Sequence, residues 1–203
     1  MFSTVVRNVV GKLLVTLVLF LLGSGVFADS DRAKRPFSVV EIEKAKLIVY
    51  VPARPEWDYS VEPRDGTYAV ILTTPEKFYP QASMEIILNH RLDINPLNFE
   101  VTALDALNTI RQRSGMRKSL TKSDLQFVSF GDIQAYEDTF ELKLKGKNFS
   151  VKSIMGLMPS GHPITIFIAT PKGQLKHIKV ITEKIFGKLK EIQSNPSEKM
   201  LRK

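Results

Sequence analysis

Hydrophobic and polar residues alternate most regularly in the middle of the chain. In the segment 140–145, phenylalanine or leucine alternates with glutamate or lysine, so one face of a strand would be buried and the other wet. The Gly-Lys-Asn sequence at 146–148 is typical of a turn, and the segment 149–152 resumes the alternation. After a Pro-Ser-Gly turn at 159–161, the run 164–169 is apolar enough for a strand covered on both faces. This pattern predicts an antiparallel meander.

Earlier segments are also typical of strands. The segment 47–51 consists of β-forming residues and ends at Pro52. A short strand is predicted at 59–61, and the continuous apolar run 68–73 is typical of a central strand. Apolar residues alternate within 83–92, which predicts a further strand.

The first helix is predicted between Asn98 and Gly115. Asn98 is a suitable N-cap, and Glu100 suits the positive first turn of a helix. Apolar residues then recur at helical spacing, at Val101, Leu104, Leu107 and Ile110.

A second, longer helix is predicted from Thr170 to about residue 193. Thr170 can cap it, and Pro171 would occupy the first turn, where proline is tolerated. Apolar residues three or four apart then form one stripe over about five turns, at Leu175, Ile178, Ile181, Ile185, Leu189 and Ile192.

The order of elements is strands, a helix, a meander of strands and a closing helix. That order predicts an α+β fold, in which an antiparallel β-sheet is covered by helices. We assign residues 37–193 to a single α+β domain, 29–36 to a flexible leader and 194–203 to a polar tail. A chain of this length can bury a sizeable core without a covalent staple.

The first 28 residues have the organisation of a cleavable signal peptide. Arg7 and Lys12 are followed by an uncharged apolar stretch at 13–22. Val26-Phe27-Ala28 then offers small residues where a signal peptidase cleaves, and Asp29 begins the polar chain. A retained membrane anchor is the alternative, but the apolar run is shorter than the roughly 20 residues that a stable span needs. We therefore expect an exported protein, periplasmic or secreted, with no membrane span after cleavage.

The amino-acid composition excludes several kinds of chemical site and indicates the charge of a partner. The chain has no cysteine, which excludes thiol nucleophiles, cysteine metal sites, disulfides and a lipoprotein linkage. Its net charge is +8, and loss of Arg7 and Lys12 with the signal leaves six excess positive charges. Such an excess can attract an anionic partner, although it is also ordinary for exported proteins.

The order of elements resembles the PsbP/Mog1-like α/β/α sandwich family. The resemblance rests on the strand and Pro-x-x-x-x-Trp turn at 51–57, the mid-chain helix, and the Gly-Asp-Ile-Gln-Ala-Tyr sequence at 131–136. A hairpin, the Pro-Ser-Gly turn, an apolar strand and the closing helix complete it, over roughly residues 37–193. The family includes DcrB-type envelope proteins and Eag-type adaptors. The resemblance implies an α/β/α sandwich and a binding or accessory role, without a site.

Candidate catalytic and metal-binding residues are few. The histidines, His90, His162 and His177, lack the local spacing of a zinc site. Ser160 and His162 share a turn but lack the Gly-x-Ser-x-Gly elbow of many hydrolases, and the turn alone explains them. Acids near strands, which could form a carboxylate pair but are usually solvated, are Asp124, Asp132, Glu137, Asp138 and Glu141. We expect no cofactor and no metal.

A basic connection after the first predicted helix is the best interaction candidate. It could bind an anionic lipid, a polyanion or an acidic protein face, or it could be a solvated helix end whose cations complement the helix dipole. Nucleic acid is a poor candidate because no aromatic residues are interleaved with the cations. The residues concerned are Arg111, Arg113, Arg117, Lys118 and Lys122.

The leading hypothesis is a non-enzymatic exported binding or accessory protein, chaperone- or adaptor-like, that docks a protein or envelope partner on the sheet or along the basic connection. A second hypothesis is a carrier of a small apolar ligand between sheet and helix, in a pocket lined by residues such as Phe140, Phe149 and Phe167. A third is an enzyme whose site assembles only in three dimensions.

The signal interpretation has a direct test. When the full chain is expressed in a secreting host, intact-mass spectrometry should find an exported product that begins at Asp29. Replacing Ala28 by leucine should block processing because the peptidase requires a small residue there, whereas Ala28→Gly should be processed normally. An exported product that retains residues 1–28 would contradict the interpretation.

Overall fold

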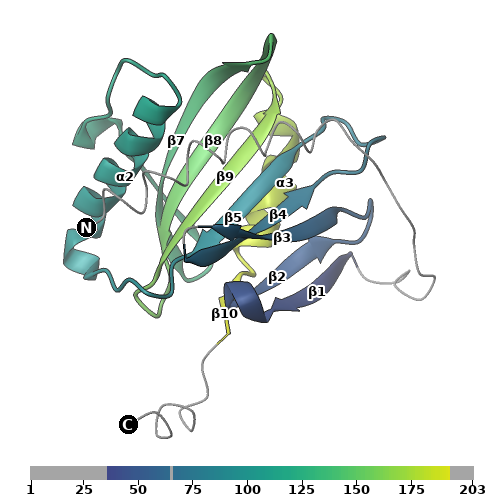
Figure 1. The fold of residues 1–203 in the computed structure, drawn as a ribbon, viewed down its shortest axis with the longest axis horizontal. Coiled ribbons are helices and arrows are strands. Elements are labelled where there is room, and N and C mark those ends of the chain that lie inside the picture. Colours follow the sequence, from purple (N-terminus) through teal and green to yellow (C-terminus); the bar gives the residue numbers. More distant parts are fainter. Residues whose placement is uncertain (1–35, 65, 193–203) are drawn as a thin grey trace, which may run out of the picture.

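The computed structural model describes residues 36–64 and 66–192. The predicted signal at 1–28, the leader at 29–36 apart from Pro36, and the tail at 194–203 lie outside these residues. Figure 1 shows the described chain as a large twisted sheet with helices on both of its faces.

The large sheet has seven strands, and every neighbouring pair is antiparallel. In spatial order the strands are β3 (Asp58–Arg64), β4 (Thr67–Thr73), β5 (Ser83–Leu88), β9 (Pro163–Pro171), β8 (Lys147–Leu157), β7 (Ile133–Leu144) and β6 (Gln126–Phe130). Strands β7 to β9 form the predicted meander, and β6, which was not predicted, extends it at one edge. Strands β3, β4 and β5 confirm the predicted segments, with β3 longer than expected and β5 ending at Leu88.

A second, three-stranded sheet was not predicted. It consists of β1 (Phe37–Ile42), β2 (Leu47–Pro52) and β10 (Lys190–Glu191). The segment 47–51 is therefore a strand, as predicted, but it lies in this small sheet. Short 3-10 turns lie at Glu43–Ala45, Pro96–Asn98 and Lys122–Asp124.

The large sheet has an apolar core on each face. One core joins the sheet to the helix α2 (Phe99–Arg113), and the other joins it to the helix α3 (Leu175–Phe186) and the small sheet. Strand β5 supplies both cores because its side chains alternate: Met84 and Ile86 face α3, and Ile87 faces α2. The structure confirms the α+β class and an antiparallel sheet covered by helices.

Helix α2 begins where the sequence predicts, but it buries a slightly different face. Asn98 occupies the cap position without a side-chain cap bond, and Asn95 Oδ1 accepts from the Leu97 N–H at 3.0 Å. Leu107 and Ile110 are buried as predicted, whereas Val101 is 49% exposed. Phe99 and the small residues Ala103 and Ala106 of the helix are buried in the core instead.

The prediction of a helix from Thr170 to residue 193 was wrong at both ends. Thr170 and Pro171 belong to β9, where they pair with Ser150 and Phe149, so the proline follows a strand and not an N-cap. The helix begins only at Leu175 and stops at Gly187. Leu189 and Ile192 lie beyond it, where the chain turns into β10.

Two glycines fix the end of α3 against the turn between β6 and β7. Gly131 has a φ of +58°, and a Cβ built on it would lie 2.9 Å from the Gly187 carbonyl oxygen. Left-handed backbone alone costs a non-glycine residue about 1–2 kcal/mol. The contact with rigid backbone adds a steric penalty.

Two alanine substitutions separate these effects. Gly131→Ala should lower the free energy of unfolding by about 2–4 kcal/mol, because strain and a steric clash combine. Gly146→Ala, at a φ of +79° with nothing within 4 Å of a Cβ, should cost only the strain of about 1–2 kcal/mol. Urea unfolding of both variants measures the difference, and equal losses would show that the close approach is unimportant.

Candidate functional site

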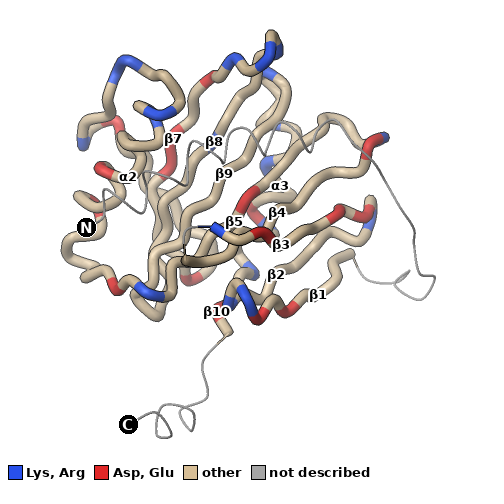
Figure 2. The backbone as a smooth tube through the Cα atoms, viewed as in Figure 1, with Lys and Arg blue, Asp and Glu red and all other residues tan. Residues whose placement is uncertain are grey.

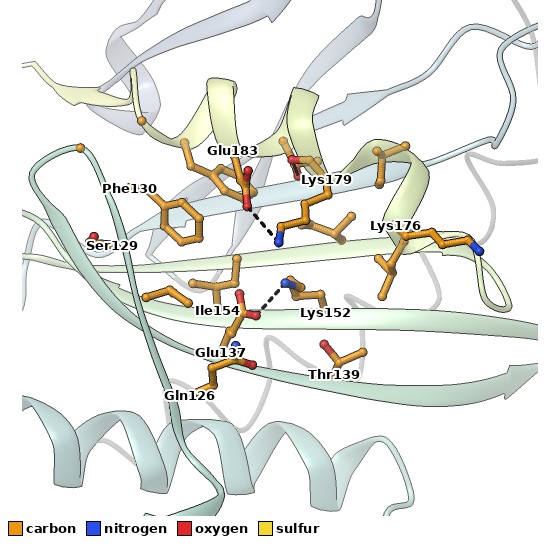
Figure 3. A pocket seen from close by; sticks show the side chains of 18 residues that line it. Gln126, Ser129, Phe130, Glu137, Thr139, Lys152, Ile154, Lys176, Lys179 and Glu183 are labelled. Carbon is orange, nitrogen blue, oxygen red and sulfur yellow. Dashed lines mark hydrogen bonds and ion pairs between the residues drawn. The ribbon is translucent and has the colours of Figure 1, made fainter.

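A groove lies between α3 and the strands β6, β7, β8 and β9 (Figure 3). Its volume is about 660 Å³, within the range of roughly 300–1,000 Å³ typical of small-molecule sites. The floor is apolar and comes from both the sheet and the helix, through Val128, Phe130, Ile154, Ile168, Ile178 and Phe186.

The alternation of side chains along the strands explains why the apolar floor of the groove and the polar side chains beside it lie on the same face of the sheet. Val128 pairs with Ala135 across β6 and β7, and Ile154 pairs with Ile166 across β8 and β9, so these side chains share the face that α3 covers. Further along the same face, Glu137, Thr139 and Lys152 replace apolar residues. The groove therefore changes from apolar to polar along its length.

The apolar end is closed. The rings of Phe130 and Phe186 meet edge to face with centroids 5.1 Å apart. Next to these rings, the backbone of Gly131 lies close to that of Gly187. Figure 3 shows Phe130 at this end of the groove. Lys176 lies at the opposite end, near the start of α3.

Charged side chains line the polar part. Lys152 Nζ lies 2.8 Å from Glu137 Oε1, and both side chains are largely shielded, at 23% and 10% exposure. Lys179 and Glu183, on α3, form a looser and more exposed pair at 3.8 Å. Lys176 lies at the rim of the groove. The groove thus combines three cations with two anions.

The predicted basic connection lies elsewhere, in the last turn of α2 and the loop that follows it (Figure 2). Arg111 is engaged in structure: its Nε donates to Asp138 Oδ2 at 2.7 Å, and its Nη1 donates to the Lys118 carbonyl at 2.9 Å. Lys122 forms an exposed pair with Glu100 at 3.3 Å. Arg117 and Lys118 are exposed, and Arg113, in the last turn of α2, is half-buried. Binding by this connection stays a prediction.

The phenylalanines proposed to line a ligand pocket lie in the core. Phe140, Phe149 and Phe167 are buried on the α2 face of the sheet, and none of them lines the groove, which is on the opposite face. That part of the carrier hypothesis was wrong, because alternation in β7, β8 and β9 directs these side chains away from α3. The residues that do line a groove were not identified from the sequence.

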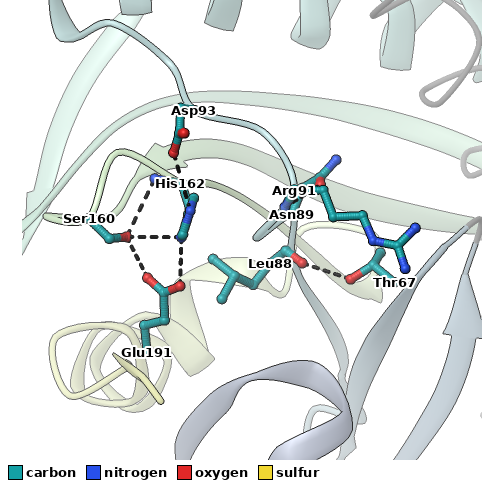
Figure 4. Close-up of polar contacts among 8 residues, drawn as sticks. All are labelled: Thr67, Leu88, Asn89, Arg91, Asp93, Ser160, His162 and Glu191. Atoms are coloured by element: carbon teal, nitrogen blue, oxygen red, sulfur yellow. Dashed lines mark hydrogen bonds and ion pairs between the residues drawn. The ribbon is translucent and has the colours of Figure 1, made fainter. Parts of the chain in front are cut away.

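Ser160 and His162 lie in a polar cluster with Glu191 and Asp93 (Figure 4). His162 Nδ1 is 2.6 Å from Glu191 Oε1, and its Nε2 is 3.2 Å from Asp93 Oδ1. Ser160 Oγ donates to Glu191 Oε2 and lies 3.3 Å from the same Nδ1. Glu191 is 29 residues from His162 in the sequence, and only the fold brings it to this turn.

The geometry of this cluster differs from that of a serine hydrolase. In a catalytic triad, serine and carboxylate contact opposite nitrogens of the imidazole. Here Ser160 and Glu191 share Nδ1, and Asp93 occupies the Nε2 side. Since β10 contributes Glu191, the cluster fastens that strand to the turn between β8 and β9.

The other candidate residues are dispersed. His177 is exposed on α3, and burial, with the charge of Arg91, lowers the pKa of His90. Glu137 and Asp138 face opposite sides of β7 and bind different cations. Within residues 36–64 and 66–192, no three histidine or acidic side chains are placed to hold a metal ion.

A buried ion pair lies in the sheet. Glu85 is fully buried in β5, and Arg64 Nε donates to its Oε1 at 3.0 Å. Arg64 Nη2 is 2.7 Å from Glu62, and no described residue donates to Glu85 Oε2. Burial raises the pKa of Glu85 to about 7, and the attraction of Arg64 only partly opposes this.

Comparisons with known proteins support the fold alone. No family model matches the chain, and no curated protein matches it significantly. A crystal structure from Bacteroides thetaiotaomicron has a TM-score of 0.51 at 11% identity, over 79% of this chain and 50% of the other, so this chain spans about half its length. LpqN of Mycobacterium tuberculosis, involved in cell envelope biogenesis, has a TM-score of 0.43 at 13% identity, over 77% and 86%. PA94 of Pseudomonas aeruginosa, a protein of unknown function, has 0.41 at 11%, over 79% and 100%.

Within residues 36–64 and 66–192, no helix is both long enough and apolar enough to cross a bilayer.

The raised pKa of Glu85 predicts a pH-dependent stability. An unfolded glutamate titrates near 4.5, so between about pH 4.5 and 7 the folded chain retains a proton that the unfolded chain has released. The free energy of unfolding should therefore fall as pH rises through this window, by up to about 3 kcal/mol.

Urea unfolding at several pH values measures this change. Glu85→Gln should flatten the profile because the amide does not titrate, whereas Glu76→Gln, at an exposed position, should leave it unchanged. An identical slope in wild type and Glu85→Gln would refute the assignment.

Proposed function

We propose that this chain is an exported, non-enzymatic binding protein of the PsbP/Mog1-like type, and that the groove beside α3 is its binding site. The observation that carries the proposal is the groove itself: an apolar floor closed at one end, with a shielded Lys152–Glu137 pair in its polar part. Mostly apolar concave sites with a few placed polar groups are the usual form of ligand sites.

The dimensions of the groove favour a narrow occupant. Helix α3 is twelve residues long, about 18 Å, and runs along it. A molecule or segment of similar length could lie between the helix and β6 to β9. This combines the two binding hypotheses, since a carrier or an accessory protein would use the same surface. The basic connection after α2 is proposed as a separate docking surface.

Two features support a non-enzymatic role. The Ser160–His162–Glu191 cluster has both partners on one imidazole nitrogen, which is unsuited to proton relay from the serine hydroxyl. Within the groove, Lys152 is paired with Glu137 and Lys179 with Glu183, so none of these four side chains provides an obvious nucleophile or base. Export rests on the sequence pattern of residues 1–28.

A groove-narrowing substitution tests the site. Thr139 is exposed and lines the groove, so Thr139→Trp should obstruct it without disturbing a core contact. Binding of the uncharged dye Nile red, followed by fluorescence, should weaken at least about tenfold, equivalent to about 1.4 kcal/mol.

Gln134→Trp is the matched control, because Gln134 is exposed on the same strand but does not line the groove. Circular dichroism confirms that both variants fold. If Nile red binds wild type and Thr139→Trp equally well, or does not bind wild type, the groove is not a ligand site.

A further inference from the structure

We infer that the groove selects anionic single-chain amphiphiles, with the acyl or alkyl tail directed toward Phe130 and the acidic headgroup held between Lys152 and Lys176. This rests on the proposed function and names the class of ligand for it. The inference comes from the position of Phe130 at one end of the groove and of Lys152 and Lys176 further along it, with the Lys179–Glu183 pair on α3 between Phe130 and Lys176 (Figure 3).

The apolar end suits a flexible chain. Ile154, Ile168 and Phe186 form an apolar floor, the Phe130–Phe186 contact closes it, and Ser129 and Glu183 lie at its edge. Burial of methylene groups there would contribute roughly 0.8 kcal/mol per group. A bulky or polar ligand would leave its polar groups unpaired at this end, which is costly.

The other end suits an acid. The Lys152 ammonium has three donors, and Glu137 at 2.8 Å accounts for one of them. Thr139, which is paired with Lys152 across β7 and β8, adds an exposed hydroxyl. Lys176 stands at the rim, without an ion-pair partner among the described residues. An acidic headgroup would thus meet the Lys152 ammonium and a hydroxyl, with Lys176 at the rim, where Figure 3 shows its side chain extending away from Lys152.

The charges that line the groove favour an anionic headgroup over a cationic one. Both carboxylates of the groove, Glu137 and Glu183, already face lysines, which leaves Lys176 as the excess charge. A cationic headgroup would have to displace Lys152 from Glu137 in a partly desolvated place. An anionic headgroup can share Lys152 with Glu137, since a charge-assisted hydrogen bond to each acceptor is possible. Carboxylate and phosphate share this chemistry.

Four probes with closely matched tails separate the contribution of the headgroup from that of the tail. Isothermal titration of the full chain with dodecanoate, dodecyl phosphate, dodecyl maltoside and dodecyltrimethylammonium, each below its micellar concentration, compares two anions with a neutral and a cationic head. The anions should bind at least about tenfold more tightly than the neutral and cationic probes. The stronger of the two anions distinguishes a carboxylate from a phosphate ligand.

Lysine substitutions locate the headgroup. Lys176→Met, at an exposed position, should weaken dodecanoate about three- to tenfold and leave dodecyl maltoside unchanged, and the double variant with Lys152→Met should abolish the preference for anions. Lys184→Met is the control, because Lys184 is exposed on α3 but does not line the groove. It removes the same charge and should bind like wild type.

The results of these experiments separate failure of the inference about the ligand from failure of the proposed function. If Nile red binds the groove but the four probes bind equally, or the cation binds best, the inference is overturned and the binding site stands. If Lys184→Met weakens dodecanoate as much as Lys176→Met does, the preference comes from overall charge, and the inference also fails. If Nile red and all tailed probes fail to bind, both proposals fail.

Discussion

The structure depends on covering both faces of a seven-stranded sheet that is apolar on each side. Strands such as β5 and β9 contribute side chains to two cores at once, so neither face tolerates water along its centre. Helix α2 packs on β7 and β8 on one face. On the other face the small sheet and α3 lie side by side. Helix α3 packs on β8 and β9, and the groove forms beside it, where its coverage of β7 and β6 ends.

Buried charges in this sheet are tied to specific partners. Glu85 is held by Arg64 in one half, and Asp138 by Arg111 in the other, both on the α2 face. Removing one member would leave an uncompensated charge in a place of low dielectric, which is far more costly than losing an exposed pair. Arg111 thus belongs to the folded framework, although its sequence neighbours make it look like part of a surface patch. The exposed cations Arg117 and Lys118 differ from it only in tertiary environment.

The periodicity of apolar residues predicted the strands and helices that are determined by residues close together in the sequence. Alternation at 140–152 predicted β7 and β8 because the phenylalanine, leucine and valine side chains of this segment all face the α2 core, and the spacing at 98–110 located α2. The predicted start of α3 was wrong because it relied on Pro171, and proline suits the end of a strand as well as the first turn of a helix. The pairing of β2 with β10 joins residues over 140 positions apart, and no local pattern encodes it. The groove could not be predicted because it depends on which strands the helices leave uncovered.

The two ends of α3 are held in different ways, and this bears on how a ligand would reach the groove. At the carboxyl end, the Phe130–Phe186 contact, the approach of Gly131 to Gly187 and the cluster of Glu191 with Ser160 and His162 all fix the chain. The amino end follows Gly173, whose N–H donates to Ser150 Oγ at 2.7 Å. A tail directed toward Phe130 would therefore meet a fixed wall, while its headgroup stays at the end where Lys176 is exposed. A charged head remains near water there, so binding buries the apolar part without desolvating the acid completely.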